Sequence, residues 1–258
     1  MRRIYRTIMF IILCAVIIAR SRDISSLSDI ITAASFSGSD ETEENDDSDH
    51  PEEETSSSGM SYKEFSLDAV PEYTGEPYAD INDDIPFFTE EEITPDAFEY
   101  YGELDDLGRC TMTVACVGPE TLPTEKRGGI GMVKPTGWHT VKYDFINGKY
   151  LFNRCHLIGY QLTGENANER NLITGTRYLN IEGMLPFENS VREYIDGTGN
   201  HVMYRVTPYF KGDDLLARGV LMEAQSVEDP AVRFCVFCYN VQPGVEIDYR
   251  TGDNYLSE

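Results

Sequence analysis

A set of polar residues between positions 154 and 188 combines side chains that can take up protons, bind cations and bind anions. Arg154 and His156 lie close together, Asn171 follows the histidine by fifteen residues, Asn180 comes nine later, and Glu188 eight after that. Phosphodiester hydrolysis needs a base to activate water, a divalent cation to neutralise developing charge, and cationic or amide donors to hold the phosphate. A lone histidine in a strand is more often structural, but these neighbours favour a catalytic one.

The asparagines bear on how such a site would hold its cation. Magnesium prefers oxygen ligands, and carboxylates are the usual choice, but an asparagine amide oxygen is also a hard ligand. A site with one neutral ligand would leave most of the coordination shell to water and substrate phosphate. The spacing allows a one-metal site of this kind without requiring it.

A hairpin is expected to position the arginine and the histidine. Segments 139–146 and 149–158 have strand-like sequences, and they meet at Asn147-Gly148, a dipeptide that favours tight hairpins. The second segment carries both Arg154 and His156, so the hairpin would place them near its end.

A helix is expected to follow. Phe187, Val191 and Ile195 recur at steps of four and predict a helix that stops at the glycine-rich segment 196–200. A short helix is also expected around 95–101. Further strands are predicted at 109–118, 201–210, 215–227 and 232–241, with 211–214 as the turn of a second hairpin. We therefore expect an α+β fold with an antiparallel central sheet and an inserted ββα unit.

The segment "NRCHLIGYQLTGENANERNLITGTRYLNIEGMLPFENSVREYI" resembles the DNA/RNA non-specific endonucleases, the ββα-metal (His-Me finger) nucleases, and especially their secreted Gram-positive, streptococcal-type DNase branch. The signature of that family is Asp-Arg-Gly-His, two asparagines nine residues apart, and a helix with Leu-Glu-Asn. The resemblance extends from "FSLDAVPEYTGEPY" through "LDDLGRC" and "GMVKPTGWHTVKYDFI" to "NVQPGVEIDYRTGDN". A pattern of so many parts is more specific than any single tripeptide.

The resemblance implies a role for each member of the polar set. His156 would be the general base that takes a proton from the attacking water, and Asn180 the direct magnesium ligand. Asn171 would help to hold that site or the scissile phosphate, and Glu188 would anchor metal-bound waters. The cofactor would be Mg²⁺, with Mn²⁺ as a substitute, and the products would carry 5′-phosphate and 3′-hydroxyl ends.

Three arginines are assigned to the substrate. Arg154 would contact phosphate as part of the signature, and Arg192 is a second candidate for that contact. Arg127, in the glycine-rich segment 125–137, would belong to a loop that follows the phosphate backbone. A structural alternative stays open for the two residues of the helix. The helix dipole would favour the carboxylate of Glu188 in the first turn, and Arg192 would be the ordinary salt-bridge partner of Glu188.

Two positions depart from the signature. Asn153 stands where the family usually has aspartate, and we expect it to be tolerated because it keeps size and hydrogen bonding. Cys155 stands where the family usually has glycine, and its side chain would crowd the base or be a redox liability. An alternative function follows, a catalytically impaired surface protein that keeps the nuclease fold and binds nucleic acid.

The N-terminal part predicts export. Residues 1–22, with three arginines before the apolar run Ile8–Ala19, are expected to be a signal peptide or an N-terminal membrane anchor. Residues 23–60 are expected to be a disordered acidic linker, because 37–59 hold ten acidic residues and no basic ones. Residues 61–258 would form the endonuclease domain. The protein is expected outside the cell, secreted or tethered at the outer face of the membrane, without an obligate protein partner.

The charge is unfavourable for partners such as DNA and RNA. The 258-residue chain has a net charge of -24, and -14 remains when the ten acidic residues of 37–59 are removed. Non-specific binding therefore requires local positive potential at the site, and we expect it to be weak and salt-sensitive.

Histidine and cysteine residues elsewhere are assigned to structure. His139 and His201 lack comparable neighbours. Cys235 and Cys238 are three apart in a predicted strand, so they would point to opposite faces, and buried thiols are favoured over a zinc site.

Overall fold

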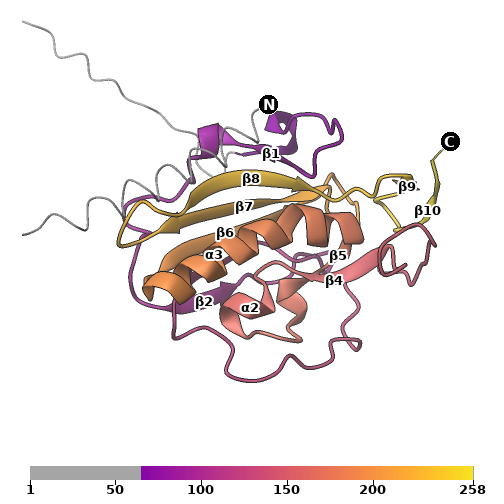
Figure 1. The fold of residues 1–258 in the computed structure, drawn as a ribbon. Coiled ribbons are helices and arrows are strands. Elements are labelled where there is room, and N and C mark those ends of the chain that lie inside the picture. Colours follow the sequence, from indigo (N-terminus) through magenta and orange to yellow (C-terminus); the bar gives the residue numbers. More distant parts are fainter. Residues whose placement is uncertain (1–64, 258) are drawn as a thin grey trace, which may run out of the picture. The chain divides into compact units, whose positions relative to one another are not determined.

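The structure is a computed structural model, and it describes residues 65–257 (Figure 1). The predicted signal peptide or anchor at 1–22 and the predicted acidic linker at 23–60 lie outside the described residues. Within 65–257, no helix is both long and apolar enough to cross a membrane.

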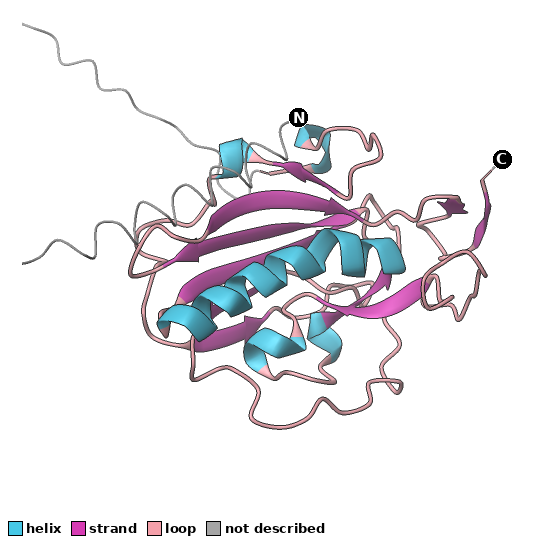
Figure 2. Cartoon of the chain, in the orientation of Figure 1, coloured by secondary structure: helices cyan, strands magenta, loops and turns pink. Residues whose placement is uncertain are grey.

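A six-stranded antiparallel sheet forms the framework (Figures 1 and 2). Its strand order is β1-β8-β7-β6-β3-β2, and every neighbouring pair is antiparallel. The six strands are β1 (Tyr78–Asp80), β2 (Phe98–Tyr101), β3 (Thr113–Val117), β6 (Val202–Tyr209), β7 (Gly219–Ser226) and β8 (Arg233–Tyr239). The two-stranded pairs are β4 (Phe152–His156) with β5 (Leu172–Thr176), and β9 (Val245–Ile247) with β10 (Asn254–Leu256). The expected α+β class with an antiparallel central sheet is confirmed.

Both faces of the sheet are covered, and β8 shows how the sequence produces this. Its side chains alternate between two apolar clusters, because successive residues of a strand point to opposite faces. Cys238 packs toward α3 (Leu185–Thr198), while Cys235 packs on the other face with Phe65 and Phe87. All five cysteines of the described residues are free and buried. The buried-thiol prediction is therefore confirmed for this pair.

The helix α3 lies across one face of the sheet (Figure 1). Val191 and Ile195 are 0% and 2% exposed, as the spacing of four predicts. Gly199 ends the helix in the left-handed conformation with φ 73°, which favours glycine, and its N–H bonds the carbonyl of Ile195 at 2.8 Å. A π-helix, Leu179–Met184, runs directly into α3, and a short helix, α2 (Tyr160–Thr163), lies beside it.

For the hairpin expected at Asn147-Gly148, the predicted pairing of segments 139–146 and 149–158 as strands was wrong. The turn exists, since Gly148 and Lys149 have positive φ, but segment 139–146 contributes only one bridge, Lys142 with Tyr150. β4 pairs instead with β5, in the register His156↔Leu172. Burial explains the choice, because every residue of β5 is buried, whereas only one residue of 139–146 is. The ββα unit is thus β4, β5 and α3.

The short helix expected around 95–101 was also wrong. Phe98–Tyr101 form β2, which pairs with β3 in the register Phe98↔Cys116. Three of its four residues are aromatic, and aromatic residues favour a strand that has a partner to pair with. The long connection from β3 to β4 has neither helix nor strand (Figure 2), and it passes the site described next.

Candidate active site

The ββα unit and the connection before it surround a pocket of about 780 Å³. It brings together five of the seven predicted site residues: Arg127, Arg154, His156, Asn180 and Glu188. The charged groups of its lining are three arginines, the third being Arg177, and the single carboxylate of Glu188. The pocket is therefore locally positive in a chain whose net charge is -24.

Two predicted site residues do not line this pocket. Asn171 is fully buried, and its amide accepts from the N–H of Ile158 at 2.9 Å and donates to the carbonyl of Ile158 at 3.0 Å. It closes the end of the β4–β5 ribbon beside His156, so it can position the site but is not placed to touch phosphate. Arg192 pairs with Asp196 at 2.9 Å and donates to the carbonyl of Gln161 at 2.8 Å. The guanidinium of Arg192 is therefore held by protein groups outside the pocket lining, and its ion-pair partner is Asp196, not Glu188.

His156 is held as a neutral base. Its Nε2 lies 2.8 Å from the carbonyl oxygen of Asn166, and a carbonyl can only accept, so Nε2 carries the proton. Nδ1 then has the free lone pair, which receives a hydrogen bond from Arg127 at 3.2 Å. Burial lowers the pKa of His156 to about 4, and the nearby Arg127 charge adds to this, while the bond to Asn166 opposes it. At neutral pH the ring is uncharged and able to accept a proton.

Glu188 is the buried carboxylate of the site. It lies in the first turn of α3, and its side chain accepts a hydrogen bond from Gln161 at 3.4 Å. Burial raises the pKa of Glu188 to about 7. A cation beside it would favour the ionised form, because opposite charges attract strongly in a poorly solvated site.

The donor set can be compared with the needs of a divalent cation. No group of three or more His, Cys, Asp or Glu side chains in residues 65–257 could hold a metal ion. Asn180 and Glu188 nevertheless supply oxygen ligands to the same pocket. Magnesium keeps several waters and often binds proteins through only one or two side-chain oxygens. The residues therefore fit magnesium better than a metal that requires a complete protein cage.

Arg154 is engaged with its surroundings. Its guanidinium donates to the carbonyls of Val133 and Gly131, the latter at 3.0 Å, and lies 4.0 Å from the ring centre of Trp138. These contacts fix the loop before β4 against the pocket. Arg154 therefore lines the pocket, and in this structure its guanidinium binds the loop before β4.

Comparison with known proteins decides the family. The family model described as DNA/RNA non-specific endonuclease matches residues 90–228, which is more than half of the chain. The chain belongs to the DNA/RNA non-specific endonuclease family.

Individual members agree with this. A deoxyribonuclease of Streptococcus dysgalactiae subsp. equisimilis is 33% identical over 108 residues, which are 40% of this chain and 32% of that relative, so the chain spans about a third of its length. NucA from Streptococcus agalactiae with magnesium ion bound has a TM-score of 0.66 at 23% identity, covering 74% of this chain and 94% of NucA. The Sda1 nuclease with bound zinc ion has a TM-score of 0.54 at 28% identity, covering 62% and 81%. The likenesses show the ββα-metal nuclease fold.

Cys155, a departure from the family signature, does not line the pocket. Its thiol is 1% exposed, donates to Asn180 Oδ1 at 3.1 Å and lies 3.4 Å from the sulfur of Met184. Gly175 on β5 makes room for it, because a Cβ there would lie 2.7 Å from the Cβ of Cys155. Burial raises the pKa of this thiol well above its usual value, so the reactive thiolate is suppressed. This geometry does not place the thiol against His156 or make it reactive, but it does place it against the side-chain oxygen of Asn180, the predicted metal ligand.

The replacement Cys155→Gly is therefore expected to destabilise the protein without accelerating cleavage. It removes a buried side chain and puts glycine into a strand, which together cost about 1–3 kcal/mol. Urea unfolding of the wild type, Cys155→Ala and Cys155→Gly would show stability falling in that order. Faster plasmid cleavage by Cys155→Gly would instead mean that the side chain obstructs the site.

Several pocket residues were missed by sequence reasoning. Gln161 donates to Glu188 and also to Asn189, at 3.0 Å, and Gly159 leaves space for the carboxylate, because a Cβ there would lie 2.5 Å from Glu188 Oε2. Both follow the signature histidine within five residues, which is the signal that could have found them. Trp138 and Tyr150 come from the connection before β4, where no periodicity marks them.

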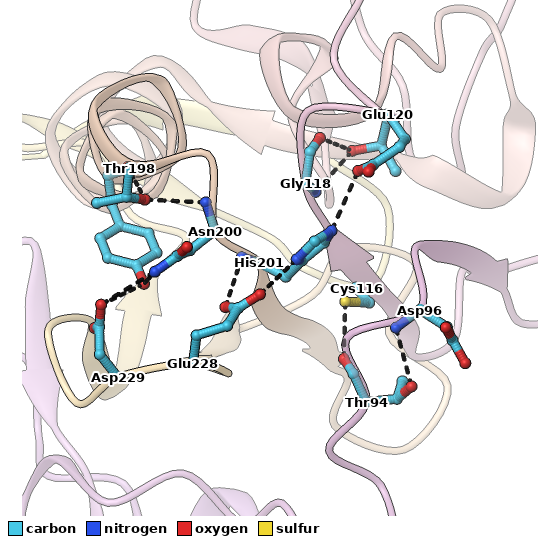
Figure 3. Close-up of polar contacts among 12 residues, drawn as sticks. Thr94, Asp96, Cys116, Gly118, Glu120, Thr198, Asn200, His201, Glu228 and Asp229 are labelled. Carbon is cyan, nitrogen blue, oxygen red and sulfur yellow. Dashed lines mark hydrogen bonds and ion pairs between the residues drawn. The ribbon is translucent and has the colours of Figure 1, made fainter.

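The histidines assigned to structure lie outside the pocket lining. His139 bonds the carbonyl of Thr251 at 2.9 Å. His201 lies between two carboxylates, Glu228 at 2.7 Å and Glu120 at 3.2 Å (Figure 3). It joins the start of β6 to the segments after β3 and β7. The bond to Glu228, with smaller contributions from Glu120, raises the pKa of His201.

This network predicts a pH-dependent stability. Since the folded-state pKa is raised, the stabilisation is fully present below the unfolded pKa of about 6.5 and is lost as the pH rises through the folded value. At pH 6 the free energy of unfolding of the wild type should exceed that of His201→Gln by up to about 1 kcal/mol, a small difference because the carboxylates are partly exposed. The difference should be lost by pH 9, where the histidine is neutral. Urea unfolding of both proteins measures this difference. A difference that stays constant with pH would refute it.

Proposed function

We propose that this protein is a magnesium-dependent endonuclease that hydrolyses phosphodiester bonds of DNA, and of RNA, without sequence specificity. The observation that supports this most is the composition of one pocket: a neutral histidine, one carboxylate, one amide ligand and three arginines. Membership of the non-specific endonuclease family and the likeness to magnesium-bound NucA and zinc-bound Sda1 support a nuclease that uses a divalent metal.

In this proposal each side chain has a task that its geometry allows. His156 accepts a proton from the attacking water at Nδ1, with Nε2 anchored to Asn166. Arg127 donates a hydrogen bond to Nδ1 in this structure. When the attacking water occupies that position at Nδ1, the guanidinium of Arg127 moves to the phosphate. Asn180 and Glu188 would hold the divalent cation, directly and through waters. The cation would supply charge neutralisation at the phosphate.

The choice of metal and the location of the protein are also part of the proposal. Oxygen ligands favour Mg²⁺, and Mn²⁺ would substitute because it accepts the same ligands. The N-terminal sequence supports a secreted or membrane-tethered protein, and the fold is similar to that of an extracellular endonuclease, with a TM-score of 0.51 at 20% identity. Immunodetection in culture medium and membrane fractions would separate secretion from tethering.

Digestion of plasmid DNA and of a structured RNA tests the activity. The purified protein should degrade both with Mg²⁺, stop when a chelator is added, and resume when excess Mg²⁺ is restored. Salt-sensitive binding of DNA without any degradation would overturn the proposal and select the alternative of a nucleic-acid-binding surface protein.

A further inference from the structure

Two buried hydrogen-bond donors in the pocket wall have no partner among the described residues. They are Nδ2 of Asn153 and Nε of Arg177, and both residues line the pocket. Buried polar groups of folded proteins are nearly always hydrogen-bonded, because leaving a donor unpaired costs free energy. Two such donors in one pocket indicate a ligand that accepts hydrogen bonds.

Arg177 differs from the other two arginines of the pocket. Arg127 is bonded to His156, and Arg154 is bonded to two backbone carbonyls. Within residues 65–257, the buried Nε of Arg177 has no hydrogen-bond partner, although the backbone N–H of Arg177 bonds the carbonyl of Leu151 at 2.8 Å. The backbone is therefore fixed while the cation is left for another partner.

The two donors come from neighbouring parts of the chain. Asn153 pairs with Gly175 in the β4–β5 ribbon, and Arg177, the first helical residue after β5, donates its backbone N–H to the carbonyl of Leu151, two residues before Asn153. Both side chains line the same pocket. An amide donor and a guanidinium in one pocket suit an anion with several oxygens.

We propose that Asn153 and Arg177 form a subsite for a backbone phosphate next to the scissile one. This inference rests on the proposed nuclease function. The subsite opens into the pocket that also holds His156 and Asn180, and a volume of about 780 Å³ exceeds the need of a single phosphate. The ring of Tyr150, which is 45% exposed, lies on the same lining, and the Lys142 ammonium 4.5 Å from its centre places a further cation beside this area.

The amide of Asn153 is part of this inference. A carboxylate at position 153 would add an acceptor and a negative charge beside Arg177, and would compete with phosphate for the guanidinium. Asn153→Asp, which preserves the size of the side chain, should therefore weaken phosphate binding. A purely steric role for Asn153 would leave binding unchanged.

Fluorescence anisotropy with a labelled single-stranded 12-mer, measured on the full chain in chelator, tests the subsite. Arg177→Ala should weaken binding about tenfold, since a charge-assisted hydrogen bond is lost. It should also reduce the slope of log K against log salt by about 0.7, the value for one phosphate of a single strand. Asn153→Asp should weaken binding in the same direction. Arg233→Ala removes the same charge at an exposed end of β8 and should leave the slope unchanged.

The outcomes separate the subsite from the proposed function. Equal slopes for Arg177→Ala and Arg233→Ala, or unchanged or tighter binding by Asn153→Asp, would overturn the subsite even if the wild type cleaves plasmid. If the wild type cleaves nothing but Arg177→Ala still loses affinity and slope, the subsite stands and the nuclease proposal fails. Thermal unfolding of Arg177→Ala should match the wild type, because its Nε has no protein partner to lose, whereas Asn153→Asp should be at least as stable as the wild type because it can pair with Arg177.

Discussion

Replacing His156 by alanine is expected to slow phosphodiester cleavage by about 10²–10⁴-fold, the usual contribution of a general base. His156 is the imidazole of the pocket, and the lone pair of its Nδ1 accepts a hydrogen bond from Arg127. Binding of nucleic acid should be retained, because the arginines are untouched. Initial rates on plasmid with Mg²⁺, together with 12-mer affinity in chelator, would measure both quantities.

A matched control is available in His139→Ala. The ring of His139 bonds the carbonyl of Thr251, and it does not line the pocket. Its replacement should leave the cleavage rate within about threefold of the wild type, since it touches no reacting group. If both histidine variants lost activity equally, the loss would reflect folding. If neither did, another group would have to be the base.

The pH profile gives a second check on His156. Its pKa of about 4 means that the neutral, proton-accepting form persists well below the usual histidine value of about 6.5. A fall in activity between pH 8 and pH 6 should therefore not come from this ring. At cation concentrations below saturation, such a fall would be assigned to Glu188, whose pKa is raised to about 7 in the metal-free protein, because its protonation opposes binding of the cation.

The sequence predicted the residues of the site better than it predicted the pairing of the strands around them. His156, Asn180 and Glu188 were identifiable because their types and spacing match a motif of many parts, and all three line one pocket. Arg192 could not be placed from sequence, since i,i+4 spacing offers a partner on either side and the structure chooses Asp196. Asn171 was predicted to be part of the site, and its amide is used instead by the backbone of Ile158.

The errors in the fold have a common physical cause. The Asn147-Gly148 dipeptide is a local signal, and it did produce a turn. Which strands pair is decided by burial between distant segments, so β4 took the fully buried β5 as its partner. The same holds for Trp138 and Tyr150, which were not predicted and which a connection without periodicity brings to the pocket. Local patterns predict elements, but they do not predict which irregular segment covers a site.

Binding of a divalent cation is expected to release about one proton at pH 6, and that proton should come from Glu188. Its pKa is about 7 because burial disfavours the carboxylate, so at pH 6 it is mainly protonated. A cation held nearby favours the ionised form, so the proton must leave as the cation binds. Apparent Mn²⁺ affinity should then rise about tenfold per pH unit below pH 7 and level off above it.

Glu188→Gln should remove this linkage, because the amide has no proton to exchange in this range. Affinity for Mn²⁺ should fall about 10–100-fold at pH 8, as for other groups that hold metal-bound waters, and should no longer vary with pH. Calorimetric Mn²⁺ titrations in two buffers of different ionisation enthalpy would measure both affinity and protons released. Glu182→Gln is the matched control, an exposed glutamate of the π-helix outside the pocket lining. Undiminished proton release in Glu188→Gln would place the titrating group elsewhere, whereas loss of affinity without loss of folding would fix Glu188 as the residue that couples pH to the metal.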